Sequence, residues 1–350
     1  MNRLPHFELF SRRLAVLLVV ALLGFGTVLG PASAKNLNVK MATLSPDNSP
    51  WDKILEDMGK SWQKDTDGRV SLTIYPGGVS GDEADILRKM KIGQIHAAAI
   101  SISGLADIDK DFTVFEVPLF YRDFAEMSQV LDELTPSLNK KLDEKGYVLL
   151  GWGYVGWVHF FTSKQVSSLD DFKALKIFTW AGDNTMEDWW RRNGFKPVAL
   201  AATDIVTGLE TGMIEAISVP PLYAMQMQFH KQTPYMADLG LAPLVGAILM
   251  SKRAFNRIDQ ADREAVLAAG RIAQKQVFER IPKLDETAVA LMEGSGMKIV
   301  KIKDSDNSQE WVDAAEQFAE AMRGDIVPEP IFDEALAARD RYRAAQPDSP

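Results

Sequence analysis

The chain has 350 residues, a net charge of −9, an apolar fraction of 46% and no cysteine. This length suits two lobes better than one hydrophobic core, and cores of that size need no disulfides. The acidic balance argues against a nucleic-acid partner and against docking on an anionic membrane, because both require clustered positive charge.

The N-terminus has the three parts of a secretory signal peptide. Arginines precede an apolar run from Leu14 to Leu29, and Pro31-Ala32-Ser33-Ala34 supplies the small residues of a cleavage site. We expect cleavage after Ala34 and export to the periplasm; an uncleaved anchor helix is the alternative, although the run is short for a membrane span. Removal of residues 1–34 takes away three arginines and one glutamate, and it shifts the net charge from −9 to −11.

Apolar patterns of period two and period 3.6 alternate along the rest of the chain and predict an α/β fold. Asp82 caps a helix that follows a glycine-rich loop, and Pro282 is expected to kink a long helix. Strands are predicted at 37–42, 70–75, 96–100, 147–152, 157–162, 176–179, 196–200, 243–251 and 297–302. Helices are predicted at 50–66, 123–144, 184–192, 258–294, 309–322 and after 327, besides those of the repeat described next.

One segment occurs twice, about 120 residues apart. Residues 85–97 match residues 204–216 at an Asp-Ile start, a central glycine, and the isoleucine and alanine that follow. Each copy predicts a short helix, a helix-terminal glycine (Gly93 or Gly212) and a small-residue strand. Two lobes of one design predict a cleft between them, where a small molecule would bind.

Residues 151–156 fit the dinucleotide pattern G-x-G-x-x-G, but the context excludes that function. The fingerprint needs a helix to begin at the glycines, whereas the residues from Trp157 continue as a strand. The bulky Trp152 and Tyr154 also stand where a backbone must approach phosphate. A glycine-rich crossover with aromatic side chains along the cleft is the better interpretation, and aromatic core packing is the alternative.

Catalytic patterns are sparse. The mature chain has three histidines, His96, His159 and His230, without metal-ligand spacing, and it has no G-x-S-x-G motif or cysteine nucleophile. We therefore expect no enzyme activity, metal or cofactor. Seven of the eight tryptophans lie between Trp51 and Trp190, around the predicted cleft. Aromatic rings offer a ligand a large, rigid contact area.

Several segments, taken together and in order, carry a resemblance to a known family. They are 42–46 (ATLSP), 49–51 (SPW), 66–70 (TDGRV), 74–78 (IYPGG), 93–98 (GQIHAA), 117–123 (VPLFYRD), 168–177 (SLDDFKALKI) and 208–216 (GLETGMIEA). Over roughly residues 38–300 the chain resembles solute-binding proteins of TRAP (tripartite ATP-independent periplasmic) transporters.

The resemblance implies a two-lobed periplasmic binding protein of α/β class, with an inter-lobe cleft and a long helix spanning both lobes. It also implies delivery of a small-molecule ligand to membrane permease subunits, driven by an ion gradient. After the signal peptide, lobe I is expected at 35–155, with part of 243–258 returning to it. Lobe II is expected at 156–242, the spanning helix at 259–294, and the C-terminal strand and helices at 295–350.

The chain departs from the family where the ligand is usually held. Family members place an arginine after the Leu-Lys-Ile strand, where it pairs with the carboxylate of an organic acid; this chain has Phe178 there. The usual Asp-Gly pair is Glu215-Ala216, followed by Ser218 and Val219. A neutral, aromatic or largely apolar solute is therefore expected. Lys164, Arg191 or Arg192 could replace the missing cation, although the sequence favours a solvated surface position for each of them.

These inferences define a candidate site. Phe178 and Trp180 alternate along one strand and so share a face. Ser101 ends a strand of the first lobe, where α/β sheets hold ligands. A periplasmic enzyme using the same cleft, or a ligand sensor or scaffold, is the alternative function. The ligand-binding residues are predicted to be Trp51, Ser101, Trp152, Tyr154, Trp157, Phe178, Trp180, Asn184 and Tyr223.

Overall fold

The computed structural model describes residues 36–182, 184–302 and 308–346. The predicted signal peptide and its cleavage site lie outside these residues. No helix of the described part is both long and apolar enough to cross a membrane.

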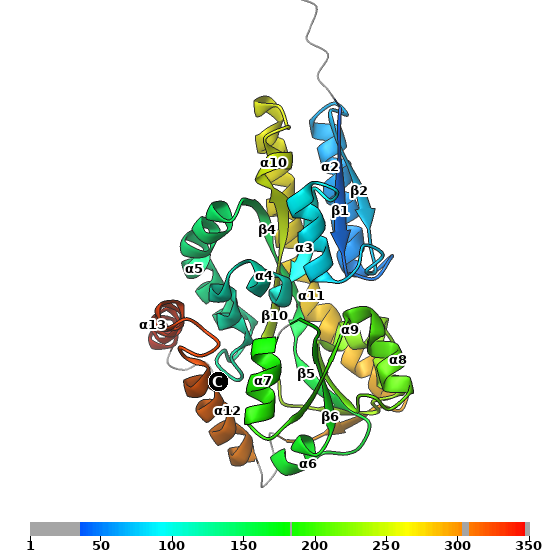
Figure 1. The fold of residues 1–350 in the computed structure, drawn as a ribbon, viewed down its shortest axis with the longest axis vertical. Coiled ribbons are helices and arrows are strands. Elements are labelled where there is room, and N and C mark those ends of the chain that lie inside the picture. Colours follow the sequence, from blue (N-terminus) through cyan, green and yellow to red (C-terminus); the bar gives the residue numbers. More distant parts are fainter. Residues whose placement is uncertain (1–35, 183, 303–307, 347–350) are drawn as a thin grey trace, which may run out of the picture. The chain divides into compact units, whose positions relative to one another are not determined.

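The described chain is built on two β-sheets (Figure 1). The first sheet has the order β2-β1-β3-β10-β4, with β1 parallel to β2 and β3, and β10 antiparallel to β3 and β4. Its strands are β1 (Leu37–Thr43), β2 (Val70–Tyr75), β3 (Ala97–Ser101), β4 (Tyr147–Trp157) and β10 (Pro243–Ser251).

The second sheet has the order β11-β9-β5-β8-β6-β7. In it β6 is parallel to β7 and β8, and β5 is antiparallel to β8 and β9. Its strands are β5 (His159–Thr162), β6 (Lys176–Trp180), β7 (Lys196–Leu200), β8 (Ala216–Val219), β9 (Tyr235–Ala237) and β11 (Lys298–Val300). Two sheets with helices between their strands confirm the two-lobed α/β fold.

Helices connect the strands and cover the sheets (Figure 1). The α-helices are α2 (Pro50–Asp65), α3 (Glu83–Ile92), α4 (Ile102–Ile108), α5 (Phe124–Glu144), α6 (Leu169–Lys173), α7 (Asn184–Arg192), α8 (Ile205–Glu210), α9 (Pro221–Gln226), α10 (Lys252–Phe255), α11 (Gln260–Gly294), α12 (Ser308–Met322) and α13 (Glu329–Ala345). Short 3-10 turns are η1 (Lys110–Glu116), η2 (Ala202–Asp204) and η3 (Phe229–Lys231).

The sequence repeat corresponds to equivalent elements in the two sheets. Gly93 ends α3 with a φ of 78°, and β3 of the first sheet follows. Gly212 follows α8 with a φ of 67°, and β8 of the second sheet comes next. Both glycines are left-handed, a conformation that glycine adopts without steric penalty. The two copies therefore share one local design, as predicted.

Two chain crossings and one long helix link the sheets. β4 passes into β5 through Val158, and β9 returns to β10 through residues 238–242. The crossings are joined because Val158 N donates to Ala242 O and Leu241 N donates to Val158 O, at 2.8 Å each. Helix α11 contacts α2 and β4 of the first sheet and α9 beside the second. It continues through Pro282, so the proline, at which the sequence predicts a kink, does not end the helix.

Strand β4 is longer than predicted and contains the glycine pattern of residues 151–156. It runs unbroken to Trp157, so no helix begins at the glycines and the exclusion of a dinucleotide site holds. The glycines serve packing instead: a Cβ on Gly151 would lie 2.6 Å from the carbonyl oxygen of Gly270 in α11. Small residues at these two positions let the long helix approach the strand closely.

Candidate functional site

A cavity of about 130 Å³ lies where strand ends of both sheets meet. This volume resembles that of an apolar protein cavity known to accept benzene. Both sheets contribute to its lining: the end of β1, β3, β4 and β10 come from the first, and Trp180, Ser218 and Val219 come from the second. We call it the first cavity. Its location at the carboxyl ends of parallel strands is the usual ligand position in α/β sheets.

Glu83 is the ionisable carboxylate of the first cavity. It is the first residue of α3, directly after the cap residue Asp82, and only 5% of its surface is exposed. Its Oε1 accepts from Ser101 N at 2.7 Å, and its Oε2 accepts from Ser101 Oγ and Gly104 N at 2.8 Å each. Burial raises the pKa of Glu83 to about 7, although these three hydrogen bonds oppose the rise.

Aromatic residues line the first cavity together with this carboxylate. Trp51, at the start of α2, donates its indole N–H to the carbonyl of Tyr154 at 3.2 Å and so connects that helix to β4. Tyr223 lines the cavity from α9, and burial, with Glu83 and Asp82 nearby, raises its pKa to about 12. Each ring is therefore placed by a different element, and Tyr223 comes from the side of the second sheet.

The described lining of the first cavity contains no lysine, arginine or histidine. The three candidate replacements for the missing cation lie at the surface in ion pairs. Lys164 pairs with Glu215 at 2.9 Å, Arg191 with Glu187 at 2.6 Å, and Arg192 with Asp325 at 2.9 Å. Their side chains are 59–70% exposed, so water already stabilises each charge.

The structure brings together most of the predicted site residues. Those that line the first cavity are Trp51, Ser101, Tyr154, Trp180 and Tyr223. Phe178 lies outside it and lines an adjacent cavity, with its ring 5.1 Å from that of Trp180. The expected shared face of Phe178 and Trp180 is therefore present, because both side chains line that adjacent cavity.

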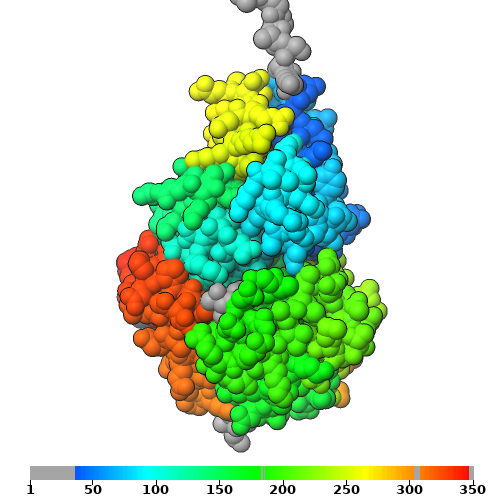
Figure 2. All heavy atoms as spheres, viewed as in Figure 1, coloured from blue at the N-terminus to red at the C-terminus, as the bar shows by residue number. Residues whose placement is uncertain are grey.

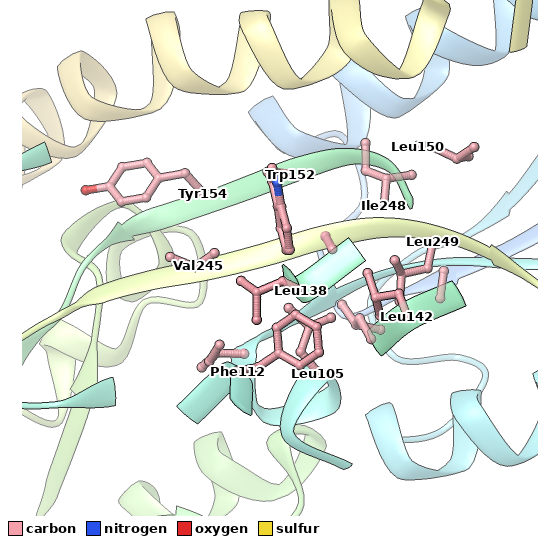
Figure 3. Packing of buried hydrophobic residues seen from close by; sticks show 14 of the residues in the cluster. Leu105, Phe112, Leu138, Leu142, Leu150, Trp152, Tyr154, Val245, Ile248 and Leu249 are labelled. Atoms are coloured by element: carbon pink, nitrogen blue, oxygen red, sulfur yellow. The ribbon is translucent and has the colours of Figure 1, made fainter. Parts of the chain in front are cut away.

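Three predicted site residues lie elsewhere, and Trp152 is the largest correction. Figure 3 shows it among Phe112 and Leu138. It is 2% exposed, and its indole N–H donates to Thr135 Oγ1 of α5 at 2.8 Å. Helix α5 covers the face of β4 to which strand alternation directs this side chain, so Trp152 is a core residue.

Trp157 and Asn184 also line neither cavity. Trp157 ends β4 at the crossing, where its backbone N–H donates to Asp285 Oδ2 at 3.1 Å and its ring lies against Gly240. Asn184 begins α7 on an exposed surface that it shares with Arg191 and Arg192. The crossing carries Trp157 past the cavity, and the orientation of α7 leaves Asn184 in solvent.

Sequence reasoning missed Glu83 as a site residue. The available signal was the second copy of the repeat, which has Ala202 at the equivalent position. A carboxylate in one copy only suggests a role beyond the shared fold. Asp82 was recognised as a cap, and it has a second function: its Oδ2 accepts from Ala202 N at 3.1 Å, which links the two repeat copies.

Comparison with known proteins identifies the family. Residues 41–324 match the family model DctP, described as bacterial extracellular solute-binding protein, family 7. The chain belongs to this family. It is therefore an extracellular solute-binding protein.

Relatives with similar sequences match this chain over most of their own length. A solute-binding protein of Verminephrobacter eiseniae is 25% identical over 277 residues, which cover 77% of this chain and 80% of the relative. The C4-dicarboxylate-binding periplasmic protein DctP of Rhodobacter capsulatus is 23% identical over 222 residues, or 61% of this chain and 66% of that protein.

Solved structures share the fold. The sugar acid binding protein DctPAm of Advenella mimigardefordensis, in complex with galactonate, has a TM-score of 0.81 at 19% identity and covers 88% of this chain and 99% of its own. A TRAP periplasmic solute-binding protein of Haemophilus influenzae with bound L-gulonate has a TM-score of 0.78 at 20% identity, with coverage of 88% and 99%. At this identity the likeness supports the fold and leaves the ligand of this chain open.

Proposed function

We propose that this DctP-family protein captures a small neutral, aromatic or largely apolar solute in the first cavity and delivers it to membrane permease subunits of a TRAP transporter. The observation that carries the proposal is the charge of the cavity lining: it contains the carboxylate Glu83 and no basic side chain among the described residues. The permease partnership rests on family membership.

The energetics of burial support an uncharged ligand. A ligand carboxylate would lose its hydration on entering the cavity, and no guanidinium or ammonium group would compensate it. It would also approach Glu83, a like charge whenever that residue is ionised. An apolar ligand gains roughly 25 cal/mol for each Å² of surface removed from water, before the costs of association.

Closure of the two lobes around the solute is the mechanism we infer. The lining comes from both sheets, so a ligand that contacts Ser101 on one side and Ser218 on the other favours a closed arrangement. The linking elements β4, β10 and α11 are continuous, which allows movement of the lobes without a flexible tether.

A sugar acid is the second candidate ligand. The structural neighbours described above were solved with galactonate and L-gulonate, and their fold matches this chain. The surface positions of Lys164, Arg191 and Arg192 weigh against it, because an acid would need a cation within the cavity.

Native mass spectrometry of the purified protein, followed by calorimetric titration, tests the proposal. We expect a co-purified uncharged solute, weak or absent binding of succinate, malate, pyruvate, galactonate and gulonate, and little salt dependence for the true ligand. Phe178→Arg should not improve binding of that ligand. Tight, strongly salt-dependent binding of an organic acid by the wild type would refute the proposal.

A further inference from the structure

The two copies of the sequence repeat differ at the position that caps their helices. In the first copy Asp82 is the N-cap of α3, and its Oδ1 accepts from Glu83 N at 2.8 Å. The equivalent residue of the second copy is Ala201, whose side chain has no acceptor. The turn η2, which leads into α8, therefore begins without a side-chain cap from its own segment. The first N–H groups of a helical segment have no partner within it, so water or another segment has to supply one.

Asp82 supplies that acceptor from the other lobe. Its second oxygen, Oδ2, accepts from Ala202 N at 3.1 Å, and Ala202 is only 5% exposed. One carboxylate thus caps the helix of its own repeat copy and the helical turn of the other copy. A carboxylate is favourable at a helix N-terminus both as an acceptor and as a negative charge. Neither residue lines the first cavity, so this link acts without contact to a solute there.

The loop before this cap, residues 76–81, also meets the second lobe at close range. It is fixed to the first sheet, since Gly78 N donates to Thr43 O at the end of β1 at 3.1 Å. A Cβ on Gly78 would lie 3.0 Å from Thr203 Cγ2 in η2 and 3.3 Å from Leu44, which lines the first cavity. Figure 2 shows the light-blue and cyan segments of the first lobe directly above the green segments of the second. The contact between the lobes therefore adjoins the first cavity.

The topology of the sheets places this contact far from the crossings. Strand β2, which precedes the loop, forms one edge of the first sheet, whereas the crossing strands β10 and β4 lie on the opposite side. Strand β7, which precedes η2, forms an edge of the second sheet, and β8 and β6 separate it from the crossing strand β5. Rotation of the lobes about the crossings moves the most distant strands furthest. Opening would therefore break the hydrogen bond between Asp82 and Ala202 while the crossings stay joined.

We propose that Asp82 is a latch between the lobes: it caps η2 only in the closed arrangement and so prolongs the closed state. Opening leaves the N–H of Ala202 to water, which replaces a hydrogen bond to a carboxylate with a weaker one. Asp82 is then a positioning residue, because it acts on solute capture through closure and not by contact. The latch rests on the lobe closure of the proposed function and not on the chemistry of the solute.

Single-molecule energy transfer in the full mature protein measures opening directly. The chain has no cysteine, so Lys91→Cys and Glu210→Cys, at exposed positions near the ends of α3 and α8, give unique sites for two dyes. We expect exchange between a short-distance closed state and a long-distance open state. In Asp82→Ser the closed state should be about tenfold shorter-lived, because a hydrogen bond to a charged acceptor is lost. Serine keeps a cap on α3, as serines do at the starts of α2 and α6.

Two further variants separate a latch from a simple helix cap. Asp123→Ser makes the same change at the N-cap of α5, where the side chain accepts from Glu126 N within one lobe, and it should leave the closed lifetime unchanged. Ala201→Ser keeps the α3 cap and gives η2 an acceptor of its own, which serves in the open and closed states alike. It should shorten the closed lifetime by about threefold without lowering the denaturation midpoint.

The outcomes decide between the two roles. Absence of a short-distance state in the parent, an unchanged closed lifetime in Asp82→Ser, or an equal shortening in Asp123→Ser would each overturn the latch. An unchanged lifetime in Ala201→Ser would do the same, even if Asp82→Ser failed to fold. These measurements use no ligand, so tight binding of an organic acid by the wild type would refute the proposed solute and leave the latch standing.

Discussion

Glu83 shows how one residue combines structural and chemical roles. Its carboxylate holds the backbone N–H groups at the end of β3 and the start of α4, and it also lines the first cavity. Burial makes ionisation expensive, so the residue binds a proton more readily in the folded than in the unfolded chain. Protonation at this position therefore couples to folding.

We predict a pH dependence of stability that Glu83→Gln removes. The folded pKa of about 7 lies above the ordinary glutamate value of 4.5, so the stability linked to this group is fully present below the unfolded pKa and is lost as pH rises through about 7. When the pH falls from 8 to 5, the free energy of unfolding of the wild type should rise by at most roughly 3 kcal/mol relative to that of the variant.

Urea denaturation of both proteins across that pH range measures the difference. Glu56→Gln makes the same chemical change on the exposed face of α2 and serves as the control. Parallel stability curves for wild type and Glu83→Gln would contradict the prediction.

At the scale of elements, close approach and buried ion pairs decide how helices attach. Helix α11 lies against β4 because Gly270 and Gly151 remove side chains from the contact. Helix α13 attaches to α5 through Glu126, which is fully buried and accepts from Arg343 Nη2 at 2.8 Å and from Arg122 Nε at 2.8 Å. Burial raises the pKa of Glu126, but the hydrogen bonds from these arginines bring it below its ordinary value.

Gly270→Ala should destabilise the protein even though alanine is the better helix former. A Cβ at this position would lie 2.2 Å from Leu150 O, which forces the helix away from the strand. We expect a net loss of about 1–3 kcal/mol in the free energy of unfolding, measured by chemical denaturation. Gly294→Ala, in open space at the end of the same helix, is the control, and an equal effect of both changes would be inconsistent with this account.

Arg343→Met should weaken the attachment of α13 to α5. The change leaves Glu126 buried with Arg122 as its remaining ion-pair partner, and we expect a loss of about 2 kcal/mol. Arg341→Met breaks the exposed pair with Glu133 on the same two helices and should cost about 0–1 kcal/mol. Denaturation midpoints and amide exchange in α13 measure both; similar values for the two variants would rule out a special role of the buried pair.

At the scale of the whole molecule, Asp285 connects elements of both lobes. It lies in α11, is 7% exposed, and accepts from Trp157 N of β4 at 3.1 Å and from Leu222 N of α9 at 2.8 Å. Burial raises its pKa to about 6, against the effect of these two hydrogen bonds. One carboxylate thus ties the spanning helix to the crossing strand and to a helix beside the second sheet.

Asp285→Ala should reduce stability by about 2–4 kcal/mol, because it removes the acceptor of a buried backbone donor, Leu222 N, and of a partly buried one, Trp157 N. Amide exchange at Leu222 should accelerate in the same variant. Glu286→Ala, the exposed neighbour in α11, is the control and should change neither property. Unaltered exchange at Leu222 in Asp285→Ala would show that the link has no mechanical importance.

Local chemistry in the sequence was enough to predict most elements. The strands at 70–75, 196–200 and 243–251 have the predicted bounds, and the repeat led directly to the equivalent positions of Gly93 and Gly212. These features depend on side-chain periodicity and backbone preference over a few residues, which the order of amino acids specifies without reference to distant contacts.

Only the tertiary structure decided which residues line the site. Trp152 and Tyr154 are two residues apart on β4 and both rings are buried, yet only Tyr154 is among the residues that line the first cavity, while Trp152 donates to Thr135 of α5. In the sequence Glu83 is an ordinary carboxylate at the start of a helix, whereas in the structure β3 and α4 enclose it. The adjacent cavity that Phe178 lines depends on contact between α12 and α7, which are more than a hundred residues apart in the sequence. Burial and neighbours arise from contacts between distant segments, so local patterns cannot specify which aromatic ring faces a ligand and which fills a core.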